Sequence, residues 1–347
     1  MKFLRYLLFP FAFIYGVITL FRNWLFDQKI LKPSEFNIPI INVGNLSMGG
    51  TGKTPHVEYI IKLIANQNKI AVLSRGYGRK TSEYIEANID HHYHEIGDEP
   101  LQFKSKFPEI SVIVEKQRVK GVLNLIYDHP DIETIVLDDA YQHRAIKAGL
   151  NVLLTTFSKP FYKDQILPIG TLREFKKGSQ RADIIIATKC PQNITEKAKQ
   201  NFKANLPKNI PIFFTTIKYG KIHSLKDQSE FNLHKNTNIL LITGIADPSH
   251  LKNELKKRKL NFKHIAFRDH YPFKEKDLEH ISEIFGKFAD ENKIILTTEK
   301  DSMRMKSLKG IDELPIHVLG IEVEFLEEKT SFDNQIMEYV RNYKKDR

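Results

Sequence analysis

The chain has 347 residues, 41% of them apolar and 27% charged, a composition that excludes disorder of the whole chain and predicts about two domains. Lysine and arginine number 53 against 42 aspartates and glutamates, so the formal net charge is +11. This balance favours anionic partners such as phosphates, acidic lipid headgroups or nucleic acid, without choosing among them.

The N-terminal segment is unusually apolar. Residues 6–21 contain no charged side chain, with Lys2 and Arg5 before them and Arg22 after them. The run is shorter than the roughly 20 residues that cross a hydrocarbon core, and no small-residue cleavage site of a signal peptide follows it. Its many aromatic residues and the flanking cations favour a helix in the membrane interface. A buried core helix and a true membrane span remain as alternatives.

The region up to residue 220 alternates short apolar runs with helical segments. The expected strands are 38–43, 70–73, 112–114, 134–137, 152–155 and 184–188, and the expected helices are 56–66 and 118–127. Continuous apolar runs of this length are typical of a parallel sheet covered on both faces. Cys190 is the only cysteine, which excludes an internal disulfide and favours a reducing compartment, and its apolar surroundings predict a buried side chain.

A phosphate-binding loop is expected directly after the first strand. Residues 42–55 read NVGNLSMGGTGKTP, in which glycines let backbone N–H groups converge on an anion and the lysine reaches the terminal phosphates. The strict pattern has glycine where this chain has Ser47. The strand before the loop and the helix after it nevertheless predict a P-loop NTPase-like α/β domain. The expected nucleotide-binding residues are Ser47, Met48, Gly49, Gly50, Thr51, Gly52, Lys53 and Thr54.

Acidic residues follow two later segments. Asp138 and Asp139 end the strand 134–137, where a P-loop enzyme needs a carboxylate for its metal, and the hydroxyl of Thr54 can serve as a further ligand. The sequence does not decide which of the two acids meets the metal. Asp98 and His270 lie in polar clusters at expected loop or strand ends, but by themselves they indicate a catalytic base only weakly.

The C-terminal third forms a second alternating series. The expected strands are 239–242, 262–267, 293–297 and 316–323, with a helix ending at residue 259 and another over 274–289. Residues 221–235 are polar and without periodicity, which is typical of a linker. The predicted organisation is a membrane-associated helix over 1–30, a P-loop kinase domain over 31–220, a linker over 221–235 and a smaller α/β domain over 236–347.

A set of motifs occurs in the order found in one family. These are GNLSMGGTGKTP, LSRGYGRK, GDEP, VLDDAYQHR, PIGTLREF, FRDHYPF and LTTEKD. The chain resembles the tetraacyldisaccharide 4'-kinases from its apolar N-terminal segment to about residue 325. The irregular start of the phosphate loop, with Ser47 in place of glycine, is also a feature of that family.

The resemblance implies two α/β domains with the active site in the cleft between them. It implies ATP- and Mg²⁺-dependent phosphorylation of the 4'-hydroxyl of a tetraacylated glucosamine disaccharide 1-phosphate, a lipid A precursor, to give lipid IVA. The expected location is the cytoplasmic face of the bacterial inner membrane. The expected partners are the lipid-linked disaccharide and the membrane surface, with no nucleic acid and no obligate protein partner.

The resemblance also implies roles for single residues. Asp98 acts as the base with help from His270, which comes from the second domain, so the two domains close before chemistry. Asp138 and Asp139 belong to the metal and nucleotide site. The further residues implied near the reacting groups or the phosphates are Gln142, His143, Arg173, Glu174, Arg75 and Arg79.

Three other functions compete with this interpretation. A nucleic-acid ATPase would fit the basic charge, but the lysines are scattered and show no stripe interleaved with aromatic residues outside the N-terminal segment. A GTPase switch would need a guanine-reading Asn-Lys-x-Asp, and the nearest matches, 188–190 and 299–301, lack the asparagine. A kinase of soluble metabolites would not need the apolar N-terminal segment.

Overall fold

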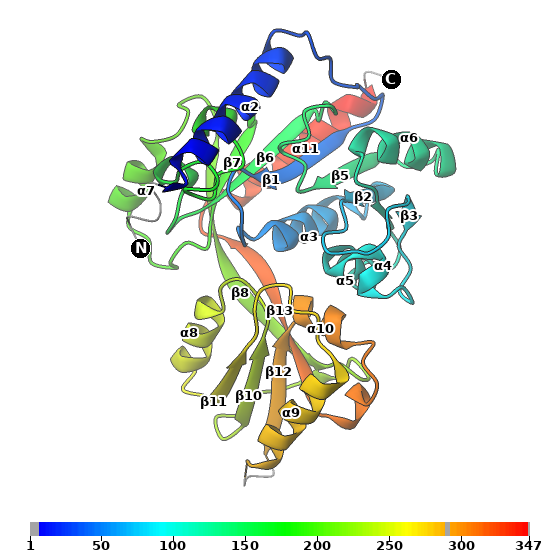
Figure 1. Cartoon of the computed structure of the whole chain (residues 1–347), viewed down its shortest axis with the longest axis vertical. Helices are drawn as coiled ribbons and strands as arrows, with labels where there is room; N and C mark the ends of the chain where they lie inside the picture. Colours follow the sequence, from blue (N-terminus) through cyan, green and yellow to red (C-terminus); the bar gives the residue numbers. More distant parts are fainter. Residues whose placement is uncertain (1–6, 289–291, 346–347) are drawn as a thin grey trace.

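The chain folds into two lobes joined by a pair of long strands (Figure 1), and the computed structural model describes residues 7–288 and 292–345. The strands are β1 Ile40–Asn45, β2 Ile70–Ser74, β3 Ile85–Glu86, β4 Ser111–Val114, β5 Thr134–Asp138, β6 Leu150–Thr156, β7 Ile184–Thr188, β8 Ile212–Ser224, β9 Glu230–Phe231, β10 Asn238–Thr243, β11 Asn261–Ala266, β12 Lys293–Thr298 and β13 Ile316–Phe325. The α-helices are α2 Phe9–Asp27, α3 Lys53–Ile64, α4 Tyr93–Ile96, α5 Asp98–Lys106, α6 Arg118–Asp128, α7 Glu196–Lys203, α8 Ser249–Lys257, α9 Glu275–Gly286, α10 Glu299–Met305 and α11 Lys329–Lys345.

The first lobe is a twisted sheet with the strand order β8-β7-β6-β1-β5-β2-β4-β3, parallel except for β3. Strand β1 lies in the middle, between β5 and β6, and Val43 of β1 pairs with Asp138 of β5. Because the carboxyl ends of parallel strands meet at one edge, the loop after β1 and the acids after β5 lie side by side. The predicted fold class, α/β with a largely parallel sheet, is confirmed.

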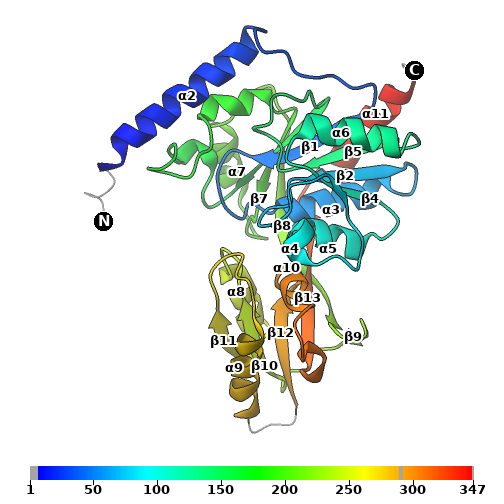
Figure 2. The ribbon, with the colours of Figure 1, turned by 45° about the vertical axis from the view of Figure 1, so that its right-hand side comes forward.

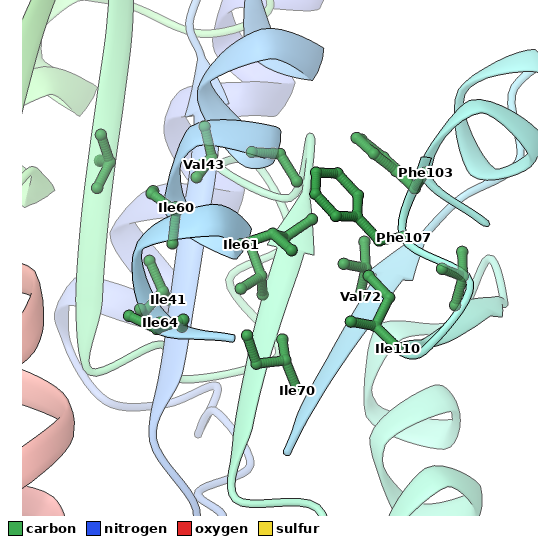
Figure 3. Close-up of a cluster of buried hydrophobic side chains, with 14 of the residues drawn as sticks. Ile41, Val43, Ile60, Ile61, Ile64, Ile70, Val72, Phe103, Phe107 and Ile110 are labelled. Carbon is green, nitrogen blue, oxygen red and sulfur yellow. The ribbon is translucent and has the colours of Figure 1, made fainter. Parts of the chain in front are cut away.

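Helix α3 covers one face of this sheet and forms a large part of its core. Figure 3 shows its isoleucines facing side chains of β1 and β2 and of the segment around α5. The labelled residues are Ile41, Val43, Ile60, Ile61, Ile64, Ile70, Val72, Phe103, Phe107 and Ile110. All ten are buried, so the phosphate loop is held between a strand and a helix that the core fixes against each other. Cys190 is buried as predicted.

The second lobe has the strand order β11-β10-β12-β13, with these four strands parallel, and continues into β8. Helices α8 and α9 pack beside this small sheet (Figure 2), and α10 begins directly after β12. The strands expected at 239–242, 262–267, 293–297 and 316–323 are all present. The helix expected over 274–289 is α9, and its predicted last residue, 289, lies outside the described residues.

Strands β8 and β13 connect the lobes as one antiparallel ribbon. Residues 212–214 of β8 pair with β7 in the first sheet, whereas residues 215–224 pair with β13. The predicted linker over 221–235 differs from this arrangement, since its first residues belong to β8 and Glu230–Phe231 form β9 against the same strand. The polar composition of this stretch reflects an exposed hairpin rather than an unstructured connection.

The C-terminal helix α11 returns to the first lobe. Phe332, Ile336 and Val340 are buried in the core beneath α3, and the hydroxyl of Tyr339 donates to the carbonyl of Ile40 at 3.2 Å. The predicted C-terminal domain over 236–347 therefore does not match the packing of α11. We propose a division in which 31–214 and 329–345 form the first domain and 215–328 the second.

Helix α2 lies along the outside of the first lobe (Figure 2). Its inward face carries small and polar residues, and Ala12 and Gly16 are buried. Its outward face is apolar and exposed, with exposed fractions between 48% and 64% for Phe9, Phe11, Phe13, Ile14, Val17, Ile18, Leu20, Phe21 and Trp24. A core helix buries its apolar face, so the alternative of a buried core helix is wrong for this segment. Residues 1–6 lie outside the described residues.

Candidate active site

The phosphate loop forms the tight turn that its sequence predicts. Gly49 and Gly52 have φ angles of 109° and 87°, which side chains with a Cβ rarely adopt, and Gly52 caps α3. The side chain of Asn45 donates to the Thr51 hydroxyl at 2.8 Å, and Thr188 donates to the Thr51 carbonyl at 2.8 Å. The loop therefore presents the N-terminus of α3, where backbone N–H groups and the helix dipole favour an anion.

A buried histidine, to which the sequence pattern gave no role, supports this loop from behind. Nδ1 of His56 lies 2.7 Å from the Gly52 carbonyl, and Nε2 lies 3.1 Å from the Thr215 hydroxyl. Because a carbonyl can only accept, Nδ1 carries the proton and Nε2 accepts from Thr215. Burial lowers the pKa of His56 to about 4, so the ring stays neutral and links the loop to β8.

A cleft of about 310 Å³ opens above the loop, between the two lobes. Its walls include residues 48–54 and Arg173 of the first lobe together with residues 245–247 and 298–300 of the second. The predicted nucleotide residues from Met48 to Thr54 all line the cleft. Ser47 does not line it, and instead its backbone forms a β-bridge with Leu172.

The two predicted metal-site acids differ in their surroundings. Asp139 lines the cleft, 3.6 Å from Nζ of Lys53, and both of its oxygens accept from Nη1 of Arg173 at 2.9 Å. Burial favours the neutral acid, but Lys53 and Arg173 outweigh it and hold the pKa of Asp139 below its usual range. Asp138 lies behind, 1% exposed, and accepts from the Ser74 hydroxyl at 2.9 Å.

The pKa of Asp138 is shifted in the opposite direction from that of Asp139. Burial, followed by the nearby charges of Glu99 and Asp139, raises the pKa of Asp138 to about 7. Its Oδ1 atom is buried without a hydrogen-bond partner among the residues that the structure describes. Burial and the two neighbouring acids therefore favour the neutral form of Asp138 below about pH 7.

The predicted base and its helper meet across the two lobes. Asp98 begins α5 in the first lobe, and its Oδ2 atom lies 3.1 Å from Nδ1 of His270 in the second. Nε of Arg304 lies 3.5 Å from the same oxygen. Although burial opposes ionisation, Lys300, His270 and Arg304 keep the pKa of Asp98 low, so this carboxylate stays charged at neutral pH.

Glu99 and Lys300 complete the contact between the lobes. Nζ of Lys300 donates to Glu99 at 3.0 Å and lies 3.4 Å from Nε2 of His270, while the Thr54 hydroxyl donates to Glu99 at 3.2 Å. From the sequence, Glu99 appears only within the motif GDEP, and no role was expected for Lys300 or Arg304. Lys300 lies in the motif LTTEKD and Arg304 three residues after its end, and these alternating charges after a buried strand were the available signal.

Arg173 and Glu174 have different positions although they are adjacent. Arg173 reaches the cleft, whereas Glu174 is 3% exposed and does not line it. Glu174 accepts from Arg181 at 2.7 Å, from Gln142 at 3.2 Å and from Asn23 at 3.0 Å. Of the two arginines expected near phosphates, Arg79 is buried and donates to backbone carbonyls, and Arg75 is exposed.

A second polar cluster joins the lobes behind the cleft. Nζ of Lys106 on α5 lies 2.7 Å from Glu58 on α3 and 2.7 Å from Glu299 on α10. Burial, and then the charge of Glu299, raise the pKa of Glu58 to about 7. Lys106 therefore pairs with two carboxylates, and the negative charge of Glu299 makes ionisation of Glu58 unfavourable.

This cluster predicts a pH-dependent contribution to stability. Between pH 4.5 and about 7 the folded state holds the Glu58 proton more tightly than the unfolded chain, so the free energy of unfolding falls as pH rises through this window. We expect the Tm of Glu58→Gln, relative to the unmodified protein, to increase between about pH 5 and about pH 8. Glu322→Gln, at an exposed ion pair with Lys62, is the control. Parallel Tm curves for the unmodified protein and Glu58→Gln would show that Glu58 titrates normally.

The comparisons with known proteins agree with this geometry. The family described as tetraacyldisaccharide-1-P 4'-kinase matches residues 4–341. The chain belongs to the tetraacyldisaccharide-1-P 4'-kinase family. A tetraacyldisaccharide 4'-kinase from Flavobacterium psychrophilum is 44% identical over 347 residues, covering 99% of this chain and 98% of the relative. One from Phocaeicola vulgatus is 42% identical over 346 residues, covering 96% of this chain and 94% of the relative.

A solved structure shares the whole architecture. The crystal structure of the "apo" form of LpxK from Aquifex aeolicus in complex with ATP is similar to this chain with a TM-score of 0.77 and 29% identity. The likeness covers 97% of this chain and 99% of that one. Membership of the tetraacyldisaccharide-1-P 4'-kinase family confirms the resemblance drawn from the motifs and makes this chain a kinase. A nucleic-acid ATPase, a GTPase switch and a kinase of soluble metabolites are set aside.

Proposed function

We propose that this kinase transfers the γ-phosphate of ATP to the 4'-hydroxyl of a tetraacylated glucosamine disaccharide 1-phosphate, giving lipid IVA. The observation that carries the proposal is that the phosphate loop and His270 border one cleft, with the buried Asp98 held against His270 at 3.1 Å. A phosphoryl transfer needs a site for the triphosphate and a proton acceptor for the attacking hydroxyl, and the loop and the Asp98–His270 pair would supply them. The printed names of the relatives supply the acceptor.

ATP binding rests on the loop and on its solved relative. The backbone of residues 48–54 would hold the β- and γ-phosphates at the start of α3, and Lys53 would neutralise their charge. Arg173, fixed against Asp139, is placed to meet the charge that develops during transfer. Residues 245–247 of the second lobe line the opposite wall, so the nucleotide would bridge the lobes.

Asp98 is the proposed base and His270 its partner. The carboxylate stays ionised because Lys300, His270 and Arg304 lower its pKa, and it can accept the proton of the 4'-hydroxyl as the new O–P bond forms. Nδ1 of His270 holds Oδ2, and the backbone N–H of Glu99 donates to Oδ1 at 2.9 Å, so the orientation of the carboxylate is fixed at both oxygens. Since these two residues come from different lobes, the base is assembled only when the lobes meet.

Magnesium fits the acidic side of the cleft. Over residues 7–288 and 292–345, no group of three or more histidine, cysteine or acidic side chains forms a metal site by itself. This suits Mg²⁺, which keeps several waters and binds through one or two carboxylates together with substrate phosphates. The buried, unpartnered Oδ1 of Asp138 is a further point in favour. Thr54, Asp138 and Asp139 would hold the ion, which neutralises phosphate charge when bound.

We also propose that α2 attaches the enzyme to the cytoplasmic face of the inner membrane. It is long and apolar enough to interact with a bilayer, and its exposed apolar face points away from the first lobe. A tetraacylated acceptor is confined to the same surface, so attachment raises the concentration at which enzyme and acceptor meet.

The outward face of α2 gives a direct test of attachment. The triple variant Phe13→Gln, Ile14→Gln and Phe21→Gln should bind vesicles of anionic phospholipid about 100-fold more weakly, at ~1 kcal/mol for partial burial of each side chain. Sedimentation with vesicles measures the change. Leu123→Gln, on the exposed face of α6, should sediment like the unmodified protein. Equal sedimentation of the triple variant would show that this face does not contact the bilayer.

The activity itself is tested with detergent-dispersed acceptor. Enzyme, ATP and Mg²⁺ should convert a tetraacylated disaccharide 1-phosphate into a product that carries a phosphate at the 4' position, as mass spectrometry would show. An acceptor with a methyl group on the 4' oxygen should give no product. Hydrolysis of ATP at the same rate with either acceptor, and no phosphorylated lipid, would contradict the proposal.

A further inference from the structure

The inward face of α2 makes specific polar contacts with the segment that carries Arg173. The hydroxyl of Tyr15 donates to the Arg173 carbonyl at 2.8 Å, and Nδ2 of Asn23 donates to Oε2 of Glu174 at 3.0 Å. Gly16 packs so closely on Phe175 that a Cβ at this position would lie 2.9 Å from the ring. Attachment to a bilayer requires only the outward apolar face, so these contacts need another explanation.

Glu174 is a buried carboxylate whose two oxygens are both occupied. Oε1 accepts from Arg181 at 2.7 Å and from Gln142 at 3.2 Å. Oε2 accepts from Asn23, which is its only hydrogen bond within the part of the chain that the structure describes. Removing this donor would leave one oxygen of a buried carboxylate without a hydrogen bond, and the carboxylate would have to move or take up water.

Gln142 connects Glu174 to Arg173, which lines the cleft. Its side-chain amide donates to Glu174 and to the carbonyl of Asn45, and its Oε1 atom accepts from Nη1 of Arg173 at 3.3 Å. The same Nη1 atom holds Asp139, which lies 3.6 Å from Lys53. An unbroken series of contacts therefore leads from Asn23 on α2 to the lysine of the phosphate loop.

We propose that Asn23 and Glu174 are positioning residues of the phosphoryl-transfer site. Through Gln142 they orient the Arg173 guanidinium against Asp139, so α2 is part of the catalytic geometry as well as a means of attachment. This inference rests on the proposed function. Rates of group transfer depend steeply on the placement of charged groups, and a guanidinium is held in one orientation only if its neighbours are fixed.

The test compares Asn23→Leu, Glu174→Gln and the double variant in detergent, where the membrane plays no part. We expect kcat for the lipid acceptor to fall about tenfold in each single variant, with the KM for ATP within about twofold, because the phosphate loop is intact. The double variant should be no slower than the slower single variant. Basal ATP hydrolysis should fall by the same factor. Ile18→Ala, on the outward face of α2, is the matched control and should keep its kcat in detergent.

Several outcomes would overturn the inference. A kcat of Asn23→Leu within about twofold of the unmodified protein would show that the contact does not position Arg173. If the fold-decrease in kcat of the double variant equals the product of the two single decreases, Asn23 and Glu174 act separately. If Asn23→Leu does not fold, Glu174→Gln alone decides, since it keeps the volume of the side chain. If the unmodified enzyme does not use the lipid, the proposed function fails, and basal ATP hydrolysis still tests the inference.

Discussion

Replacement of Lys53 by alanine should lower kcat at least about 100-fold, with the fold unchanged. Lys53 is the first residue of α3 and lies in the cleft, 3.6 Å from Asp139. Its charge would offset that of the transferred phosphate, and preorganised contacts of this kind typically contribute about 3 kcal/mol or more to the barrier. The fold should persist because Arg173 still pairs with Asp139 and the apolar face of α3 is untouched.

The measurement is steady-state phosphorylation of the lipid acceptor, with thermal unfolding as the check on folding. Lys62→Ala is the matched control, because Lys62 lies on the same helix and forms an exposed ion pair with Glu322. Its kcat should stay within about twofold of the unmodified protein, as expected for a surface pair. Activity of Lys53→Ala close to that of Lys62→Ala would mean that the loop has a structural role only.

Asp98 and His270 should act as one catalytic unit. We expect Asp98→Asn and His270→Ala each to lower kcat about 100-fold, because either change removes the oriented base. The double variant should lose little more than the slower single variant, since residues of one unit are strongly non-additive. Asparagine is chosen for Asp98 because it keeps the volume beside Lys300 and Arg304.

The chain offers a matched control for this pair. His129 and Glu86 form an acid–histidine contact of 2.9 Å on the surface of the first lobe. Replacing His129, Glu86 or both by alanine should leave kcat unchanged. Strictly multiplying losses for Asp98 and His270 would show that the two residues act independently.

Features that depend on nearby residues followed from the sequence. Continuous apolar runs predicted most parallel strands of both lobes, because a strand buried on both faces is apolar along its length whichever strand it pairs with. The partly exposed edge strand β11 is an exception. The phosphate loop followed from GGTGKT for the same reason, since its glycines, lysine and helix start form one local unit. The acids after β5 followed from the rule that the carboxyl ends of parallel strands meet at one edge.

Features that depend on distant residues needed the tertiary structure. Strand β8 has a polar second half that resembles a linker, and only its pairing with β13 shows that it is a strand shared by two sheets. Helix α11 is amphipathic like many surface helices, and its return to the first core could not be predicted from its own residues. Pairing and packing of this kind are decided by which surfaces remain to be buried once the other elements have formed.

The candidate site divides in the same way. The residues of the loop, the acids and the Asp98–His270 pair were named from the sequence and its family resemblance. Lys300, Arg304 and Glu99 gained their positions from the contact between the lobes, and Asn23 from the docking of α2 on the first lobe. A sequence specifies which side chains can ionise or donate a hydrogen bond. Their partners, burial and resulting pKa values depend on atoms that are distant in the chain, so only the folded protein decides them.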